Sequence, residues 1–501
     1  MKKLALLMAL FLELNMLAGC KNRITVDVSS EKESSTVESI CIHAPAETFP
    51  PHETDEPLEP TGEIVCIDLN GMSADAESGV LFSNTDITFT QGGIYRLSGT
   101  LEGGSIIVSA PSDTALQLIF DGAHITGNNT PLSIKSAGKV ILSLAENSQN
   151  SLTGKDTALF SNSPLTINGP GTLTVQSESG HGIAVKNTLH IAEGNLSIEA
   201  AKNGISADTH LQFDSGIITI HSGGGHENGK HPPADYADGS NPDSASSFTD
   251  KNTKGMGGKG LKSDGDILIT NGTFIVDSAD DAIHSNASLT ISGGSFSVKS
   301  GDDALHADSI LTVSDGNITV PYCYEGFEAH SVYISGGSID INAMDDGINA
   351  TDGTGRNEGE GELICISDGT VRIKALGDGL DSNGSVEIRG GYITVVCPKD
   401  GDSASLDYAK TGEISGGTFI GTGARGMAKT FSQSSQGVVG VSVGAREAKT
   451  PIRLLDKSGN LLFSLEPDYS FAVVIISSPD LVTGEEYSLS VGDTTSIHTA
   501  K

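Results

Sequence analysis

Residues 280–298 read DDAIHSNASLTISGGSFSV, and residues 302–320 read DDALHADSILTVSDGNITV in nearly the same pattern. The two stretches start 22 residues apart, at Asp280 and Asp302. A glycine recurs at the same point of successive copies, with some longer steps: Gly171, Gly194, Gly216, Gly272, Gly294, Gly316, Gly337, Gly369, Gly391 and Gly417. A fixed period of this length is typical of a solenoid, in which each copy forms one coil of a stack.

Apolar residues alternate with polar ones on both sides of each turn glycine. Around Gly294, Leu289 and Ile291 precede the glycine, and Phe296 and Val298 follow it. A third apolar position follows each acidic turn: Ile283, Leu305, Phe327, Ile348 and Leu380. Alternation with a period of two indicates strands with one buried face. The repeat therefore predicts an all-β fold, a right-handed parallel β-helix with coils of about 22 residues stacked about 4.8 Å apart.

Changes in composition divide the chain into four segments. In order, we predict a lipoprotein signal peptide, a disordered tether, the β-helix and a small C-terminal β cap of the same domain, over residues 1–19, 20–62, 63–431 and 432–501. Two insertions interrupt the repeat, at 223–257 and 351–362. The first contains His226 and His231, which we interpret as solvated loop residues; ligation of a metal together with carboxylates is the alternative.

The N-terminal segment has the form of an export signal. A basic start and an apolar run over residues 4–17 end in Leu-Ala-Gly-Cys at residues 17–20. This is the pattern of a bacterial lipoprotein, in which Cys20 becomes the first mature residue and carries the lipid. We therefore expect the protein on the extracellular face of the bacterial cell envelope, anchored in the membrane through Cys20. An ordinary cleaved signal is the alternative.

The charge of the chain excludes one class of partner. The 64 acidic residues outnumber the 30 basic ones, which gives a formal net charge of −34. Nucleic acid is excluded as a main partner because binding to phosphates depends on Lys and Arg. Clustered carboxylates repel one another unless a cation neutralises them, so the composition favours a cation-binding surface. We expect the protein to be a monomer.

Carboxylates recur at one turn of the later copies. The candidate metal ligands are Asp280, Asp281, Asp302, Asp303, Glu325, Asp345, Asp346, Asp378 and Asp381. Stacking brings equivalent carboxylates about 4.8 Å apart, where each adjacent pair repels by about 1 kcal/mol in water. Oxygen ligands from flexible turns suit Ca²⁺ better than Zn²⁺ or Mg²⁺, so we predict Ca²⁺ as the cofactor; hydrated turn residues are the alternative. The equivalent position in the preceding copy is Lys259, which confines the predicted array to the later coils.

The pattern Asp-Asp-Ala-Ile-His, followed by Leu-x-Ile-x-Gly-Gly-x-Phe-x-Val, resembles the calcium-binding β-helix carbohydrate-binding domain family of cellulolytic clostridia and gut bacteria. Residues 92–101 and 477–489 also resemble the ends of that family's domain. The resemblance implies a pectate-lyase-like solenoid without established catalysis, with bound Ca²⁺ and affinity for polygalacturonate and cellulose. We expect the residues beside the acidic column to bind this ligand: His284, His306, Glu328, Asn349 and Tyr324.

The composition favours one of these polysaccharides. Binding to flat cellulose usually uses rows of stacked aromatic rings, and the chain has no Trp. An acidic polysaccharide bridged through protein-bound Ca²⁺ is therefore the preferred ligand, and we expect no catalytic residue. Two alternatives remain open: a Ca²⁺-dependent polysaccharide lyase with Arg372 or Lys374 as base, and a surface scaffold that binds a protein partner.

Overall fold

The computed structural model describes residues 60–75, 79–233, 257–353, 361–401, 403–426 and 428–501. The predicted signal peptide, with Cys20, and nearly all of the predicted tether lie outside the described residues. Parts of both insertions, residues 234–256 and 354–360, also lie outside them. Within the described ranges, no helix has both the length and the apolar character that a membrane span requires.

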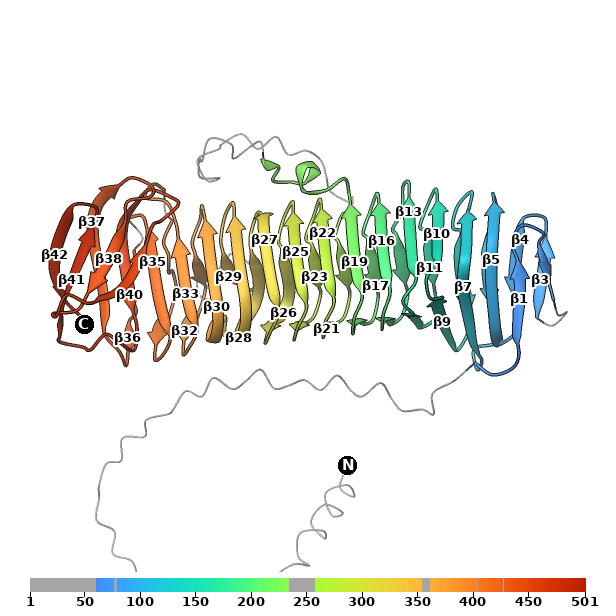
Figure 1. Cartoon of the computed structure of the whole chain (residues 1–501), viewed down its shortest axis with the longest axis horizontal. Coiled ribbons are helices and arrows are strands. Elements are labelled where there is room, and N and C mark those ends of the chain that lie inside the picture. Colours follow the sequence, from blue (N-terminus) through green and yellow to red (C-terminus); the bar gives the residue numbers. More distant parts are fainter. Residues whose placement is uncertain (1–59, 76–78, 234–256, 354–360, 402, 427) are drawn as a thin grey trace, which may run out of the picture. The chain divides into compact units, whose positions relative to one another are not determined.

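Three short strands build each regular coil (Figure 1). One coil contains β23 (Ile283–Ser285), β24 (Leu289–Ile291) and β25 (Ser295–Ser300). Each strand pairs in parallel with the next coil, so Ile283 lies opposite Leu305 and Leu289 lies opposite Leu311. The described chain is therefore a parallel β-helix, which confirms the fold class that the repeat predicts.

The remaining strands follow in chain order. The N-terminal coils contain β1 (Ile64–Asp68), β2 (Ser73–Ala74), β3 (Val80–Ser83), β4 (Asp86–Phe89), β5 (Gly93–Glu102), β6 (Ile106–Ser109), β7 (Ala115–Thr126), β8 (Leu132–Ser136) and β9 (Lys139–Leu144). The middle coils contain β10 (Gln149–Gly154), β11 (Leu159–Ser161), β12 (Leu165–Asn168), β13 (Thr172–Ser177), β14 (Ile183–Val185), β15 (Leu189–Ile191), β16 (Asn195–Ala200), β17 (Ile205–Ala207), β18 (Leu211–Phe213), β19 (Ile217–Ser222), β20 (Leu261–Ser263), β21 (Ile267–Ile269) and β22 (Thr273–Ser278), with the 3-10 helix η1 (His226–Asn228). The later coils contain β26 (Leu305–Val313), β27 (Asn317–Cys323), β28 (Phe327–Ala343), β29 (Ile348–Ala350), β30 (Leu363–Ala375), β31 (Leu380–Ser382), β32 (Ser385–Ile388), β33 (Tyr392–Val396), β34 (Thr411–Ile414), β35 (Thr418–Gly423) and β36 (Gln433–Ser434).

Ladders of apolar side chains fill the core of the β-helix. The rings of Phe274 and Phe296, on successive coils, stack 4.7 Å apart at 6°. Phe213, one coil earlier, meets Phe274 edge-on at 5.2 Å. Because the parallel pairing is in register, each inward position of the repeat becomes one such ladder, and each fully buried large side chain stabilises the fold by about 1.5–3 kcal/mol.

The turn glycine recurs for a steric reason. Gly294 has a φ of +102°, a region that residues with a Cβ rarely adopt. A Cβ at this position would also lie 2.9 Å from the carbonyl oxygen of Gly272 on the preceding coil. The tight turn and the close stacking of coils therefore both require glycine.

Antiparallel strands end the stack at its C-terminal side. β40 (Phe471–Ser477) pairs with β35 of the last coil and with β37 (Val438–Arg446). A separate four-stranded sheet follows, formed by β38 (Ile452–Leu455), β39 (Leu461–Leu465), β41 (Glu486–Val491) and β42 (Thr494–Thr499). β40 thus covers the edge of β35, which would otherwise present unpaired backbone groups.

Candidate metal and glycan site

The predicted acidic residues lie on one turn of adjacent coils. Asp280 and Asp281 stand between β22 and β23, and the equivalent turns of the next coils hold the other members of the column. Several carboxylates accept a hydrogen bond from a backbone amide one coil further on. The amide of Asp303 donates to Oδ1 of Asp281 at 3.1 Å, and the amide of Asp378 donates to Oδ1 of Asp346 at 2.6 Å. The column therefore helps to join the coils.

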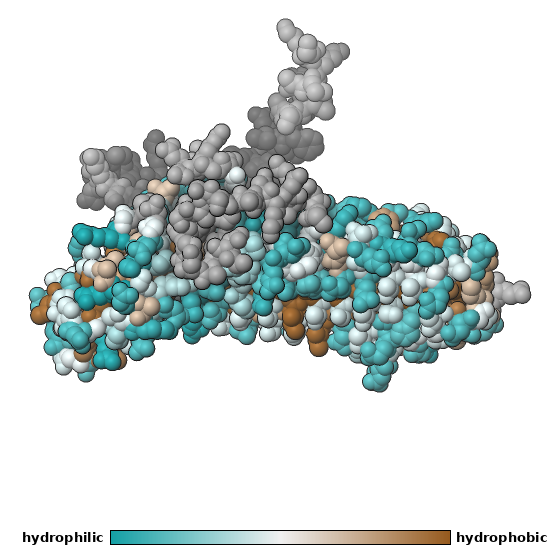
Figure 2. Space-filling model, turned by 90° about the horizontal axis from the view of Figure 1, so that it is seen from above, coloured by the Kyte–Doolittle hydropathy of each residue, from teal (hydrophilic) through white to brown (hydrophobic). Residues whose placement is uncertain are grey.

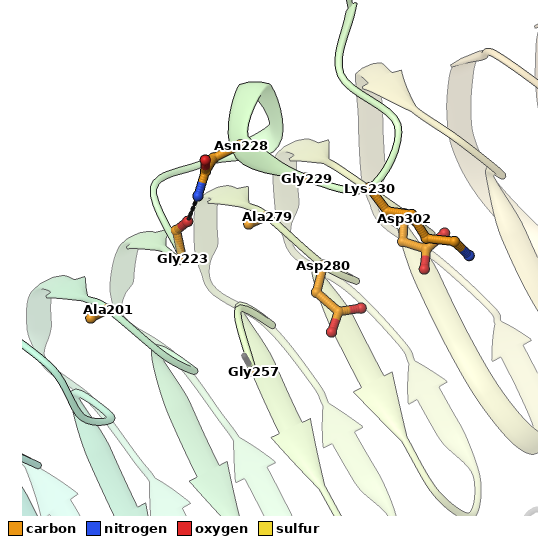
Figure 3. Close-up of a pocket in the computed structure, with 9 residues that line it drawn as sticks. All are labelled: Ala201, Gly223, Asn228, Gly229, Lys230, Gly257, Ala279, Asp280 and Asp302. Atoms are coloured by element: carbon orange, nitrogen blue, oxygen red, sulfur yellow. Dashed lines mark hydrogen bonds between the residues drawn. The ribbon is translucent and has the colours of Figure 1, made fainter. Parts of the chain in front are cut away.

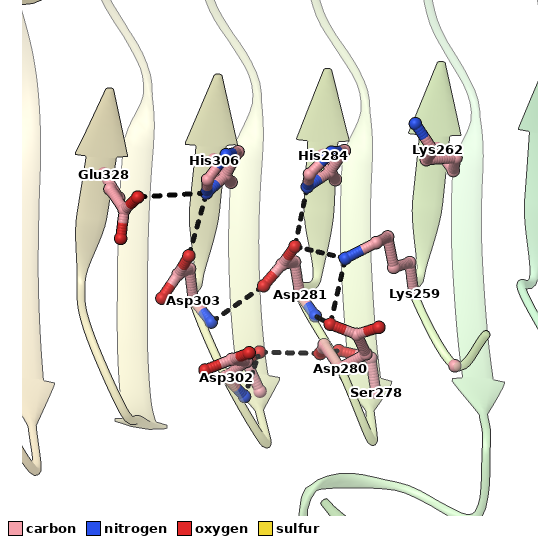
Figure 4. A network of polar contacts seen from close by, with 12 residues as sticks. Lys259, Lys262, Ser278, Asp280, Asp281, His284, Asp302, Asp303, His306 and Glu328 are labelled. Carbon is pink, nitrogen blue, oxygen red and sulfur yellow. Dashed lines mark hydrogen bonds and ion pairs between the residues drawn. The ribbon is translucent and has the colours of Figure 1, made fainter. Parts of the chain in front are cut away.

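The first acidic turn carries its own cation (Figure 4). Nζ of Lys259 lies 2.9 Å from Oδ1 of Asp280 and also contacts Oδ2 of Asp281. Burial opposes the charge of Lys259, but the two carboxylates raise its pKa above the ordinary value. Burial alone would raise the pKa of Asp281, but a hydrogen bond from His284 and the charge of Lys259 hold this pKa below its usual range.

Four of the five predicted ligand-binding residues form a second, adjoining column, which continues to the predicted metal ligand Asp381; the fifth, Tyr324, lies outside it and stacks on His231. His284, His306, Glu328, Asn349 and Asp381 lie opposite one another in register on successive coils. The rings of His284 and His306 stack 4.5 Å apart at 9°. Nδ1 of each ring faces the aspartate three residues earlier, at 2.6 Å for Asp281 and 2.9 Å for Asp303. The structure thus brings these four residues next to predicted metal ligands.

Carboxylates of the later turns lie close together, and three of them form no ion pair with a lysine or arginine among the described residues. Among the ion pairs of the described residues, none includes Glu325, Asp346 or Asp378. Burial, with repulsion from Asp303 and Asp346, raises the pKa of Glu325 well above its ordinary value. Burial, with repulsion from neighbouring carboxylates, also raises the pKa of Asp346 well above its ordinary value. These turns bury negative charge that a bound cation would stabilise.

The acidic group at the C-terminal end of the column includes Asp407, which the repeat does not predict. Carboxylate oxygens of Asp378, Asp381 and Asp407 lie within 4.8 Å of one another. Burial raises the pKa of Asp378 to about 8, although the amide of Ala404 opposes the shift. Burial and then the charge of Asp407 raise the pKa of Asp381 to about 6. Lys429 contacts Asp407 at the outer end of the group.

The first insertion begins with packed histidines, so the expectation of solvated loop residues at His226 and His231 is wrong. Both are buried, with exposures of 9% and 7%. The backbone amide of His226 lies 2.7 Å from Oδ1 of Asp277, and its ring Nδ1 lies 2.8 Å from the same oxygen. The ring of His231 stacks on Tyr324 at 3.6 Å, and Tyr322 donates a hydrogen bond to the carbonyl of His231 at 2.7 Å. Partners on neighbouring coils therefore fix this part of the insertion.

Asp302 faces a different environment from Asp303. It lines a pocket of about 140 Å³ together with Asp280 and Lys230 (Figure 3). Burial, with repulsion from Asp281, raises the pKa of Asp302 to about 7. The pocket lies beside the base of the insertion, where the backbone of Gly229 forms part of its wall. Asp302 is thus directed away from the histidine column.

The two candidate bases of the lyase alternative lie on β30. Arg372 is exposed on this strand. Nζ of Lys374 lies 2.6 Å from Oδ2 of Asp468, and an ammonium held in an ion pair cannot accept a proton. Lys374 therefore forms an ion pair with the C-terminal segment.

Comparisons with known proteins found one family and two similar proteins. The family described as carbohydrate-binding domain-containing protein matches residues 83–230, 193–304 and 302–443. A carbohydrate-binding domain-containing protein of Acetivibrio thermocellus is 31% identical over 157 residues, which are 28% of this chain and 55% of that protein, so the match spans about half the length of this relative. A solved structure titled as the gadolinium derivative of the polysaccharide lyase-like protein from C. thermocellum shares 23% identity, with a TM-score of 0.37 over 55% of this chain and 92% of that chain.

Proposed function

Because the chain belongs to the family of carbohydrate-binding domain-containing proteins, we propose that it binds acidic polysaccharide, without catalysis, through Ca²⁺ held on its stacked acidic turns. The observation that carries this proposal is the run of crowded carboxylates from Glu325 to Asp381. Ca²⁺ takes six to eight oxygen ligands in flexible geometry, which carboxylates and turn carbonyls supply. Lys259 already pairs with both carboxylates of the first acidic turn, so we assign the ions to the turns from Glu325 to Asp381.

The same ions would explain how a polyanion approaches this surface. At a net charge of −34, the protein repels polygalacturonate unless cations lie between the two. A Ca²⁺ ion that keeps an open coordination position can accept a carboxylate of the sugar as a further ligand. The neighbouring side chains of Glu328 and Asn349 are partly exposed and available to contact the chain of sugars.

Cellulose is a weaker candidate on this surface. Among the large hydrophobic side chains that are exposed in the described ranges, the aromatic ones are Phe82 and Tyr392, which lie on distant coils. Figure 2 shows hydrophilic residues over most of the face that it presents, with hydrophobic residues in small separate areas. A flat row of aromatic rings, the usual platform for cellulose, is not formed by these residues. We therefore place polygalacturonate before cellulose.

We also propose that the protein is exported and lipid-anchored through Cys20. The proposal rests on the sequence pattern at residues 17–20 alone. Labelling with a radioactive fatty acid in the native host, followed by detergent extraction, tests it. Label on the parent and none on Cys20→Ser is expected; equal labelling of both would contradict the assignment.

Electrophoresis through acrylamide that contains polygalacturonate tests the glycan proposal. We expect the parent chain to be retarded with Ca²⁺ and to migrate freely with a chelator. The double variant Asp378→Asn with Asp381→Asn should lose most of the retardation. A matched control, Asp315→Asn with Asp368→Asn, removes the same charge from exposed turns and should behave as the parent. Free migration of the parent in both gels would overturn the proposal and favour a scaffold that binds protein.

A further inference from the structure

The ring of His306 has a carboxylate partner at each nitrogen, and Figure 4 shows the contacts with Asp303 and Glu328. Nε2 lies 3.2 Å from Oδ1 of Asp308, and Nδ1 lies 2.9 Å from Oδ2 of Asp303. Nδ1 also lies 3.8 Å from Oε1 of Glu328. The carboxylates of Asp303 and Asp308 both accept hydrogen bonds, so without metal the ring donates from each nitrogen that carries a proton. A metal ion that replaces a proton at Nδ1 would meet this nitrogen together with oxygens of Asp303 and Glu328, since one ligand atom from each of the three residues lies within 4.8 Å of the others.

In the preceding coil, a lysine side chain supplies the positive charge beside an equivalent histidine and aspartate. His284 faces Asp281 through Nδ1 and Asn286 through Nε2, in the same arrangement as His306. There the ammonium of Lys259 contacts Oδ2 of Asp281 and supplies positive charge. Among the described residues, no Lys or Arg forms an ion pair with Asp303 or Glu328. The coil of His306 thus has the same donor groups, one additional carboxylate and no ammonium.

We propose that Asp303, His306 and Glu328 form a binding site for a divalent transition metal of the zinc class. Zn²⁺ binds imidazole nitrogen and carboxylate oxygen with four ligands, whereas Ca²⁺ prefers six to eight oxygens. Tetrahedral Zn²⁺, at about 2.0–2.1 Å from each ligand, separates the ligand atoms by about 3.3 Å. The distances of 2.9 and 3.8 Å from Nδ1 bracket this value, so small side-chain movements complete the site.

The surroundings of the three ligands support this assignment. Asp308 accepts a hydrogen bond from the outer nitrogen of His306, the contact that usually orients a metal-binding histidine. The stacked ring of His284 fixes the plane of His306. The side chains of Asp303, His306 and Glu328 are 9%, 17% and 21% exposed, so an ion can enter and a water molecule can take the fourth position. Glu328 also interacts with Glu325 of the proposed Ca²⁺ turns, so the Zn²⁺ site is tested with those turns saturated and without glycan.

Calorimetric titration of the metal-free full chain with Zn²⁺, in excess Ca²⁺, tests the proposal. We expect one equivalent of Zn²⁺ to bind in the presence of Ca²⁺. His306→Gln should weaken this binding by about 100-fold or more, and Asp308→Asn by about 10–100-fold, because it removes the orienting partner. The matched control His190→Gln removes a histidine that pairs with Asp214 away from this site, and it should change the affinity by less than about threefold.

Substitution with Co²⁺ provides a second readout. Co²⁺ in a four-coordinate site should give visible absorption bands that are lost in His306→Gln and kept in His190→Gln. Thermal unfolding without metal checks that each variant folds; if His306→Gln does not, Glu328→Gln replaces it. Absence of Zn²⁺ binding, its full displacement by Ca²⁺ or equal losses in both histidine variants would overturn the proposal. So would an NMR spectrum in which both nitrogens of His306 stay protonated in excess Zn²⁺, since a protonated imidazolium satisfies the contacts without metal.

Discussion

Nζ of Lys259 lies 2.9 Å from Oδ1 of Asp280, a residue on the next coil of the β-helix. The same ammonium contacts Asp281, so one side chain forms ion pairs with both carboxylates of the first turn of the acidic column. Among the described residues, no ion pair includes Glu325 or Asp346, so these two carboxylates of the later turns have no equivalent ammonium. The column therefore begins with a cation built into the chain and continues with turns that require one from solution.

Replacement of this ammonium should destabilise the protein. Lys259→Met leaves two carboxylates crowded at a mostly buried turn, and we expect a loss of about 3–5 kcal/mol in the free energy of unfolding. Chemical denaturation at neutral pH measures the loss. Lys186→Met serves as control because its ion pair with Asp208 is exposed, and it should cost only about 0–1 kcal/mol. Equal losses in the two variants would show that the buried Lys259 ion pairs stabilise the protein no more than an exposed ion pair does.

Removal of a ring from the core should destabilise the protein more than removal of an exposed ring. Phe274→Ala removes a ring that contacts Phe213 and Phe296, and we expect a loss of about 3–5 kcal/mol in the free energy of unfolding. Phe82→Ala, at a side chain that is 38% exposed, should cost less than about 1 kcal/mol. Denaturant unfolding of both variants under one condition provides the comparison. A small loss for Phe274→Ala would mean that the coils collapse into the space left by the ring.

The sequence predicts the fold because each coil repeats its own pattern. Leu289 and Ile291 alternate as strand residues, and the equivalent residues of neighbouring copies lie opposite them in the structure. The acidic column was predictable for the same reason, since parallel pairing in register places equivalent turns on adjacent coils. The tight turn at Gly294 likewise follows from local geometry. Local periodicity is therefore sufficient for the architecture and for the position of the site.

Other parts of the site depend on contacts that the period does not contain. Asp407 joins the group of Asp378, but it follows Asp381 by a step longer than the repeat and so falls outside the alignment. The ion pair of Lys259 depends on how far a long side chain reaches across a coil. The packing of His231 on Tyr324 involves residues that are far apart in sequence, and loop composition alone does not predict it.

The base of the first insertion should open when its stacking contact is removed. His231→Ala deletes the ring that packs on Tyr324, directly after the trypsin site at Lys230. We expect cleavage after Lys230 to become at least about tenfold faster, because each 1.4 kcal/mol lost from local stability increases the open population tenfold. Limited proteolysis followed by mass spectrometry measures the rate. His221→Ala, at an exposed histidine paired with Glu199, should leave it unchanged; equal acceleration in both variants would contradict a specific role for the stack.

Stability should fall as pH rises when metal is absent. Burial raises the pKa of Asp378 to about 8, whereas an unfolded aspartate has a pKa of about 3.9. The folded state therefore binds more protons, and its protonated carboxyl contributes stability that is fully present below about pH 4 and is lost as pH rises through about 8. Asp381, with a pKa of about 6, adds to the same trend at lower pH. Thermal unfolding in chelator at pH 5 and pH 8.5 should show a lower midpoint at the higher pH.

Asp378→Asn should reduce this difference because an amide does not titrate, whereas the exposed control Asp315→Asn should keep it. Saturating Ca²⁺ should also reduce the difference, since a bound cation stabilises the ionised carboxylates; an equal pH dependence with and without Ca²⁺ would place the ion away from this group.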